Sequence, residues 1–448
     1  MHTIIFRYIT GLRQNYWFWP SVMTVCAVLL GFLLPYLDAR LGSDWVRAVG
    51  FTRTIKVEGA RAILTTLATA TLGVAGVAFS VTIVAVSFAS SNYGPRLIGN
   101  FMANRKNQVI LGVFVATFVY CITVLTTVHA RTENSEATLD AFVPHLSVYF
   151  ALLLTLAAVG ALIAYIHHIP ESINIMNLTA DIGAKLQRSI NRMLDEEENG
   201  TCTVPNDDHV AVEARFRDPQ DDGAHVVRAQ ASGFLHRFDL KTLAALARKN
   251  GIQIVLHRAP GDFLVTGETI LSARPASSGE GTIGERMQDC VTQGDNRTDA
   301  QDILFLSDQL VEVLGRALSS GINDPRTAML CLDWLRGGLV AFASRPPAQP
   351  AQNGDPVLYR RVAFEDMLHR SFGEMRQYVA GDRTVTLHAM KVLTDIACAT
   401  SREAVAEACV KELHQLAGSA SELLEESVAR EEIAAGLKRA LKTISARG

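Results

Sequence analysis

The sequence contains few cysteines, and their arrangement excludes the common cysteine-based sites. Seven cysteines occur among 448 residues, and no two of them form a C-x-x-C pair. An odd number at long spacings gives no disulfide framework and none of the usual zinc-binding spacings. We interpret them as reduced thiols, which places the large C-terminal part of the chain in the cytoplasm, and we expect no metal site.

The sequence also lacks the motifs of common cofactor-binding, nucleic-acid-binding and catalytic sites. Neither G-x-G-x-x-G nor G-x-x-x-x-G-K-[ST] occurs, so we expect no cofactor. No basic stripe with interleaved aromatic residues is present, which argues against nucleic acid as a partner. Ser319 and Ser320 have no identified histidine partner, and no other nucleophile–base pair is visible. We therefore expect a protein that is not an enzyme.

Charge is scarce and unevenly distributed. Charged residues make up 19% of the chain and the mean hydropathy is +0.18, values that indicate membrane segments. Residues 1–170 contain 11 of the 42 basic residues and 6 of the 45 acidic residues. An apolar, mildly basic N-terminal part therefore precedes an acidic, water-compatible C-terminal part.

Four apolar stretches are long enough to cross a bilayer, which requires about 20 helical residues. They lie at about 18–37, 63–90, 108–128 and 145–168, and they predict a transmembrane domain over residues 1–170 with the lipid bilayer as its partner. Trp17, Trp19 and Tyr165 suit an interfacial aromatic belt.

The basic residues of the short loops predict the orientation. The N-terminus and the loop after the second span are basic, whereas the loop after the third span has only Arg131 beside three acidic residues. We expect a multi-pass protein of the bacterial inner membrane with both termini in the cytoplasm. The loop after the first span disagrees, because it carries five basic residues.

The second span is rich in small and hydroxyl residues that share one face. On a helical wheel of about 100° per residue, seven of them fall within an arc of roughly 80°. One interpretation is close packing of another helix against this face, as small-xxx-small patterns allow. The other is a polar pore or cavity at the axis of a homo-oligomer. The residues are Thr65, Thr69, Gly73, Gly76, Ser80, Ser87 and Ser91.

After the spans, an amphipathic connecting helix is expected over 171–200 and a small α+β cytoplasmic domain over 201–290. Strand character is found at 209–217 and 224–234, and a helix at 239–250 is expected to start at Asp239 and stop at Gly251. The segments 252–258 and 263–268 flank a turn and predict a hairpin. His167 and Glu171 are spaced to meet on one helical turn, but a metal site needs more ligands.

Residues 297–448 are expected to form a helical cytoplasmic domain. Thr298 and Gln301 match a capping box at its first helix, and Asp308 is expected on a solvated face. A corner follows at "ALSSGINDPRTA", where Gly321 suits a left-handed turn, and Asp324 with Pro325 suits the start of the next helix. The corner is either purely structural or part of a ligand or partner contact formed by Arg297, Asp302, Asn323, Asp324 and Arg326.

Several segments resemble a bacterial family of predicted membrane proteins known as domain-of-unknown-function family 2254. The resemblance rests on "AGVAFSVTIVAVSFASSNYGPRLI", "FMANRKNQVILGVFVATFVYC", "IHHIPESI" and "RTDAQDILFLSDQLVEVLGRALSSGINDPRTA". Ser320 stands where the family typically has proline. The resemblance implies membrane helices followed by a water-exposed region, and it implies no catalytic residues.

The expected fold class is therefore a membrane α-helical protein with four transmembrane helices, followed by a small α+β domain and a helical C-terminal region. Two functions are open. The first is an oligomeric channel or permeation protein with a cytoplasmic assembly or gating domain. The second is a membrane-anchored sensor or scaffold whose cytoplasmic domain binds an unknown ligand or partner.

Overall fold

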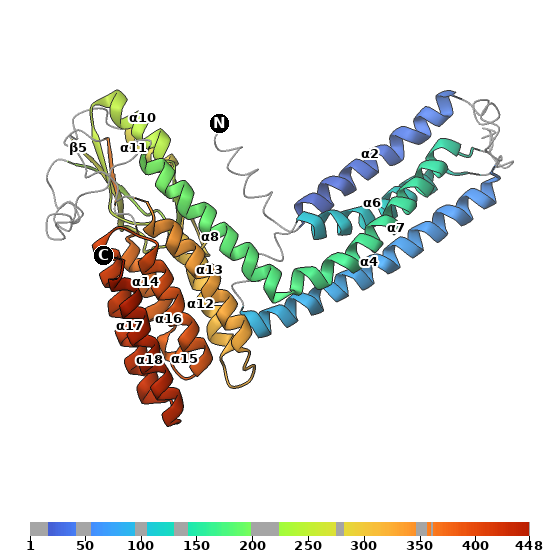
Figure 1. Cartoon of the computed structure of the whole chain (residues 1–448). Helices are drawn as coiled ribbons and strands as arrows, with labels where there is room; N and C mark the ends of the chain where they lie inside the picture. The colour runs from blue at the N-terminus through green and yellow to red at the C-terminus, as the bar shows by residue number, and fades with distance from the viewer. Residues whose placement is uncertain are drawn as a thin grey trace. The chain divides into compact units, whose positions relative to one another are not determined.

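The structure is a computed structural model that describes residues 17–41, 55–94, 105–129, 142–198, 224–274, 282–345, 356–359 and 362–447. The chain divides into two compact units, residues 1–174 and residues 175–448 (Figure 1). We refer to them as the membrane unit and the C-terminal unit.

The membrane unit contains four helices that are long and apolar enough to cross a bilayer. They are α2 (Phe18–Leu41), α4 (Val57–Tyr93), α6 (Arg105–Thr127) and α7 (His145–Ile173). The four spans expected from hydropathy are thus confirmed. Helix α4 has 37 residues, which corresponds to about 55 Å at 1.5 Å per residue. This is well above the ~30 Å of a bilayer core, so part of α4 must tilt or extend beyond it.

Helix α6 packs against α2, α4 and α7. Its contact with α2 is unusually close at two glycines. A Cβ atom at Gly31 would lie 2.8 Å from Thr123, and one at Gly112 would lie 3.2 Å from the Pro20 backbone. Because neither position has room for a larger side chain, Gly31 and Gly112 set the α2–α6 distance. Close approach through small residues is the usual way in which helices associate in lipid.

The first turn of α7 is capped by a carboxylate from a different helix. Asp38 of α2 is buried and accepts hydrogen bonds from the backbone N–H groups of Leu146 (3.0 Å) and Ser147 (3.1 Å), and from the Ser147 hydroxyl (2.9 Å). The residue that precedes α7, Pro144, offers no side-chain cap. A carboxylate at this end also complements the helix dipole. Asp38 therefore fixes the register between α2 and α7.

We expect Asp38→Ala to destabilise the membrane unit by about 2 kcal/mol, because a buried and a partly buried N–H group lose their acceptor. Thermal unfolding of the purified full-length chain in detergent would measure the loss. Asp38→Asn, which keeps one acceptor oxygen, is the matched control and should lose less. An alanine variant as stable as the wild type would show that the cap contributes nothing.

The C-terminal unit begins with the amphipathic helix α8 (Ile175–Glu198). Its buried residues recur every four positions and face the antiparallel pair α12 (Ile303–Ala317) and α13 (Pro325–Ala343). Gly183 allows the closest contact, since a Cβ atom there would lie 2.5 Å from the Trp334 ring. The apolar side chains that recur in this way are Leu178, Ile182, Leu186, Ile190 and Leu194, and Thr179 and Gly183 are buried beside them.

Two small sheets follow, and their topology corrects the hairpin expected from the sequence. One sheet has the order β1-β5-β3-β7 and the other β4-β2-β6. Strand β3 pairs with β5 and β7, whereas β4 pairs with β2. The two arms of the expected hairpin thus lie in different sheets, because each finds better partners elsewhere. The strands are β1 (His225–Arg228), β2 (Gly233–Phe238), β3 (Gln253–Leu256), β4 (Phe263–Leu264), β5 (Thr269–Arg274), β6 (Val291–Gly294) and β7 (Val357–Tyr359).

Two other strand expectations had different outcomes. The segment 224–234 contains the turn between β1 and β2 rather than one strand, and the segment 209–217 lies outside the described residues. Strand β7 comes from within the region expected to be helical and pairs in parallel with β3. Three residues of strand between helices carry too little periodicity to be recognised in the sequence.

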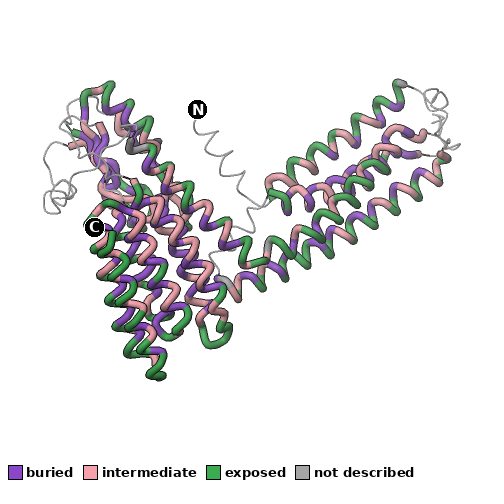
Figure 2. Tube along the Cα trace, in the orientation of Figure 1, coloured by how far each residue is buried: buried purple, intermediate pink, exposed green. Residues whose placement is uncertain are grey.

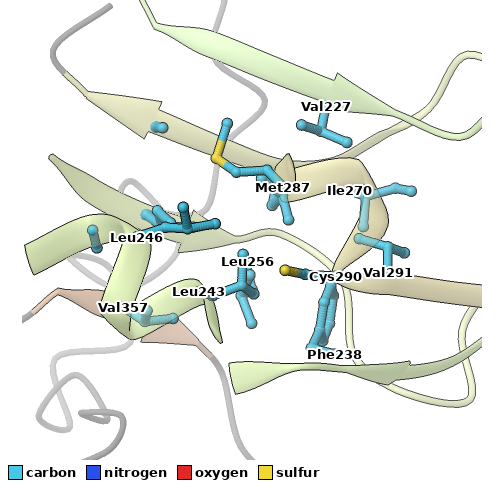
Figure 3. Close-up of a cluster of buried hydrophobic side chains, with 14 of the residues drawn as sticks. Val227, Phe238, Leu243, Leu246, Leu256, Ile270, Met287, Cys290, Val291 and Val357 are labelled. Atoms are coloured by element: carbon cyan, nitrogen blue, oxygen red, sulfur yellow. The ribbon is translucent and has the colours of Figure 1, made fainter. Parts of the chain in front are cut away.

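A compact apolar core joins the sheets to α10 (Leu240–Asn250) and α11 (Thr282–Asp289) (Figure 3). Phe238, Leu243 and Leu256 lie within it. Helix α10 begins and ends as the sequence predicts: the Asp239 side chain accepts from Thr242 N–H, and Gly251 is left-handed with φ 62°.

The rest of the unit is a helical region built on α12 and α13. It includes the π-helical segment η2 (His369–Gly373) and a C-terminal bundle in which α16 packs against both α17 and α18. The expected fold class, membrane helices followed by a small mixed region and a helical part, is confirmed. The remaining helices are α14 (Phe364–Leu368), α15 (Arg376–Val379), α16 (Arg383–Cys398), α17 (Glu403–Leu423) and α18 (Ser427–Ser445).

Candidate functional site

The small and hydroxyl residues of α4 form a continuous exposed face, which we call the α4 hydroxyl face. All seven residues predicted from the sequence, Thr65, Thr69, Gly73, Gly76, Ser80, Ser87 and Ser91, are exposed. Exposed residues run along α4 in Figure 2. A Cβ atom at Gly73 or at Gly76 would meet nothing within 4 Å. Within one chain, therefore, no described residue packs against these glycines.

A different stripe of α4 makes the contacts inside the membrane unit. It is buried and consists mostly of alanine at alternating spacings of four and three, on nearly the opposite side of the helix from the hydroxyl face. It faces α6 and α7. The close-packing interpretation of the hydroxyl face thus finds no partner helix among the described residues of the same chain. The buried stripe comprises Ala60, Leu64, Ala68, Thr71, Ala75, Ala78, Thr82, Ala85 and Ala89.

Three of the five hydroxyls of the exposed face donate to carbonyls of their own helix. Thr69 donates to the carbonyl of Thr65 (2.9 Å), Ser80 to that of Gly76 (2.9 Å) and Ser91 to that of Ser87 (3.0 Å). Each hydroxyl oxygen keeps lone pairs that point away from the helix, since one hydroxyl is one donor and two acceptors. The face is consequently stable in lipid and can still accept hydrogen bonds from outside.

Tyr165 does not belong to an interfacial belt as the sequence suggested. It is buried between α7 and α4, its hydroxyl donates to the Ala78 carbonyl, and it lies 2.9 Å from the Thr82 hydroxyl. A buried tyrosine needs a hydrogen-bond partner, and the buried stripe of α4 supplies two. Trp17 is exposed, and Trp19 stacks under the Arg105 guanidinium at 4.2 Å.

In the C-terminal unit, two buried aspartates and two partly exposed arginines form a charge network. Arg297 binds Asp302 (2.6 Å) and Asp308 (2.7 Å), and Arg370 binds both oxygens of Asp308 (2.7 and 2.9 Å). Glu374 binds Arg370 at 3.1 Å from the outside. The network connects the segment after β6 and helix α12, which are adjacent in sequence, to η2, whose Arg370 lies 62 positions after Asp308.

Burial and ion pairing have opposite effects on the pKa values of the two aspartates. Burial raises the pKa of Asp302, and its pairing with Arg297 offsets this only in part. Burial also acts to raise the pKa of Asp308, but hydrogen bonds from Arg370 and Arg297 outweigh it and hold that pKa below its ordinary value. Asp308 is therefore the ionised centre of the network.

Two sequence expectations about this region are wrong. Thr298 and Gln301 do not cap α12: the N-cap is Asp302, whose side chain accepts from Phe305 N–H. Gln301 instead bonds both backbone groups of Phe238 on β2, at 2.9 and 3.1 Å. Asp308 is not on a solvated face, because its side chain is only 5% exposed. The actual N-cap lies four positions after Thr298, and Arg370, which pairs with Asp308, lies 62 positions away in the sequence.

The corner between α12 and α13 is built largely from its own backbone and one aspartate. Asp324 caps α13 through Arg326 N–H (3.1 Å), Thr327 N–H (3.2 Å) and the Thr327 hydroxyl (2.6 Å), and Pro325 is the first helical residue, as expected. The left-handed residue, however, is Asn323, with φ 48°, rather than Gly321. Asparagine tolerates this conformation better than most residues.

The structure does not bring all five predicted contact residues together. Arg297 and Asp302 bind each other at the start of α12, whereas Asn323, Asp324 and Arg326 lie beyond its end. The 15 residues of α12 separate the two groups by about 22 Å at 1.5 Å per residue. They form two separate features, the charge network and the corner. Asp308 and Arg370 are members of the first that the sequence reading missed.

We expect Asp324→Ala to lower the free energy of unfolding by about 1–2 kcal/mol at neutral pH, the usual cost of a lost aspartate cap. The hydrogen bond from Thr327 lowers the pKa of Asp324. An aspartate whose pKa is lower in the folded state stabilises the fold at pH values above its unfolded-state pKa of about 3.9. This stabilisation is lost as the pH falls through the folded-state pKa. Chemical denaturation of the full chain at pH 7 and below pH 3 should show the difference between variant and wild type shrinking in acid. If the difference in stability between the variant and the wild type does not change with pH, the ionised Asp324 carboxylate is not its source.

The remaining candidate, the histidine at the end of α7, forms a simple pair. His167 lies 3.4 Å from Glu171. In the part of the chain that the structure describes, no group of three or more histidine, cysteine, aspartate or glutamate side chains is placed to hold a metal ion.

Four apolar helices followed by a mixed sheet region and a helical region define a multi-pass membrane protein with a large C-terminal unit. The chain belongs to the predicted membrane protein family DUF2254, which it matches over residues 13–395. It is 27% identical over 346 residues to uncharacterized proteins of Mycobacterium bovis and of Mycobacterium tuberculosis, covering 75% of this chain and 64% of each relative. The chain thus spans less than two thirds of the length of these relatives. No solved structure matches it.

Proposed function

We propose that this protein assembles into a homo-oligomer in the bacterial inner membrane and forms a permeation path along the α4 hydroxyl face. The termini are proposed to lie in the cytoplasm, and the C-terminal unit would assemble or gate the path. We propose no enzymatic role for the chain. The observation that carries the proposal is that all seven residues of the hydroxyl face are exposed while the other side of α4 is packed.

The contrast between the two exposed sides of α4 supports this choice. Large apolar side chains, including Val77, Val84 and Phe88, are exposed on a neighbouring sector and suit contact with lipid. The hydroxyl face offers glycines with open space above them instead. Small residues let two helix backbones approach closely, and this gives helices in lipid a reason to associate.

The chemistry of the face limits what such a path would conduct. Its seven residues carry no charge, and its hydroxyls present only lone pairs and small dipoles. A proton relay or a strongly selective cation path needs ionisable residues within the membrane, and the face has none. The proposal is therefore a weakly selective path for water and small solutes or ions, lined by hydroxyl oxygens and by backbone at the glycines.

The sensor or scaffold hypothesis has less support, because some of the residues predicted to contact a ligand or partner are already bonded within the chain. Arg297 and Asp302 satisfy each other within the charge network, which leaves little bonding capacity for a ligand. Asp324 is likewise occupied by its own helix.

Disulfide crosslinking across copies tests the proposed assembly. In a background carrying Cys26→Ser and Cys202→Ser, Ser80→Cys places a thiol on the hydroxyl face. Val81→Cys places one about 100° around the same helix, at an exposed apolar position outside that face. We expect oxidation in membranes to give a covalent dimer with Ser80→Cys and little with Val81→Cys. Equal crosslinking of both, or none with Ser80→Cys, would refute assembly through this face.

A further inference from the structure

Five exposed hydrophobic side chains gather at one end of the C-terminal unit. Among the residues that the structure describes in this unit, seven large hydrophobic side chains are exposed. Two of them, Phe263 and Val265, lie on and next to β4. The other five lie on helices and corners at the opposite end, as the contacts below establish. They are Met176, Ile322, Tyr378, Leu423 and Val428.

Helix contacts within the unit show that this end is the one at which α8 begins. Gly183 meets Trp334, Gly338 meets Ile190, and Asp195 binds Arg345 at 2.6 Å. The paired residues are about 150 positions apart in each case, so α8 and α13 run in parallel. The start of α8 at Ile175 is therefore level with the start of α13 at Pro325, and the corner between α12 and α13 extends beyond it.

The other helices bring their apolar residues to the same end. Tyr378 lies 3.4 Å from the position of a Cβ atom at Gly315, near the end of α12. Helix α16 runs parallel to α13, because His388 binds Asp333 and Asp395 binds Arg336. The turn between α17 and α18 reaches this end too, but it carries Glu422, Glu425 and Glu426 beside its two apolar residues.

The corner differs from that acidic turn in charge, and its backbone is held by hydrogen bonds. Its tip is Ile322, which is 43% exposed and lies near exposed Asn323 and exposed Arg326, the second residue of α13. The backbone beneath it is fixed, since the N–H groups of Ile322 and Asn323 donate to the Ser319 carbonyl and that of Asp324 to the Ala317 carbonyl. An apolar side chain is thus held outward on a rigid turn, beside a basic side chain.

We propose that this corner is a membrane-contacting tip. Ile322 would insert at the boundary between headgroups and acyl chains, and Arg326 would pair with a phospholipid phosphate. Chain order favours lipid as the occupant: α8 starts two residues after the last residue of α7, so this end of the unit is covalently attached to a helix that is long and apolar enough to cross a bilayer. Apolar side chains next to arginine are the composition of surfaces that bind at a membrane interface.

A photo-crosslinking probe at the tip tests the proposal in the full chain. Ile322→p-benzoylphenylalanine is reconstituted into vesicles of phosphatidylcholine with phosphatidylglycerol, irradiated and analysed by mass spectrometry. Val265→p-benzoylphenylalanine is the matched control, because Val265 is 52% exposed but lies next to β4. We expect lipid adducts from the probe at 322 and none from the probe at 265. A covalent dimer instead of lipid adducts, or equal adducts at both sites, would overturn the proposal.

A charge reversal separates lipid recognition from mere proximity to the bilayer. With the probe at 322, Arg326→Glu should reduce the adduct yield several-fold in vesicles that contain phosphatidylglycerol. Arg188→Glu, which reverses an exposed arginine farther along α8, should leave the yield unchanged. Adducts that are insensitive to Arg326→Glu would overturn the phosphate contact.

Discussion

Replacing Asp308 with alanine is expected to lower the free energy of unfolding of the C-terminal unit by about 2–4 kcal/mol. The carboxylate accepts from two guanidinium groups, and its side chain is 5% exposed. Its loss leaves Arg297 with one partner and Arg370 with only Glu374. We place the cost at the lower part of the range for broken buried ion pairs, because the Arg370 side chain is 39% exposed and can recruit water.

Glu374→Ala is the control for this prediction. It removes a partner of the same Arg370, but the Glu374 side chain is 46% exposed, and exposed ion pairs contribute about 1 kcal/mol or less. Hydrogen exchange of the α12 and η2 amides in the full chain would measure the loss of stability in both variants. A loss for Asp308→Ala as small as that for Glu374→Ala would show that the network does not stabilise the unit.

The second large effect is expected from Gly76→Leu on the α4 hydroxyl face. Because no described atom lies within 4 Å of the added Cβ position, leucine should fit within one chain and leave its fold intact. At an interface between copies, the same side chain would hold the two backbones apart. We expect the dissociation constant of the oligomer to rise about tenfold or more, which corresponds to about 1.4 kcal/mol.

Gly160→Leu is a matched control, because Gly160 is also an exposed glycine of a membrane helix with nothing within 4 Å. It lies on α7, outside the proposed interface. Native mass spectrometry of both variants from mild detergent would measure the oligomer population. If both variants assemble like the wild type, the hydroxyl face is not an interface.

The sequence predicted the elements of this protein that depend on local composition. The four spans follow from apolar length, and the caps at Asp239 and Asp324 follow from residue types that bond to the next turn. Helical spacing predicted that the small and hydroxyl residues of α4 share one face, but it left open whether that face is packed or exposed. The buried alanine stripe of α4 has an equally regular spacing, and that signal could have identified the packing side from the sequence.

Features that depend on distant residues were not predictable. The Asp308–Arg370 bond joins residues 62 positions apart, and Asp38 caps a helix that begins more than 100 positions later. The separation of β3 and β4 into two sheets was set by pairing with β5 and β2, which a local turn signal does not reveal. The left-handed Asn323 was missed because glycine is the usual choice for that conformation.

The central claim is that copies of α4 line a path across the membrane. Solute and ion flux through the purified protein in sealed liposomes tests it most directly, with Gly76→Leu and Gly160→Leu reconstituted in parallel. The account predicts flux through the wild type and through Gly160→Leu, and abolished or altered flux through Gly76→Leu at equal amounts of folded protein. No flux through the wild type across salts, pH values and membrane tension, or flux indifferent to Gly76→Leu, would contradict it.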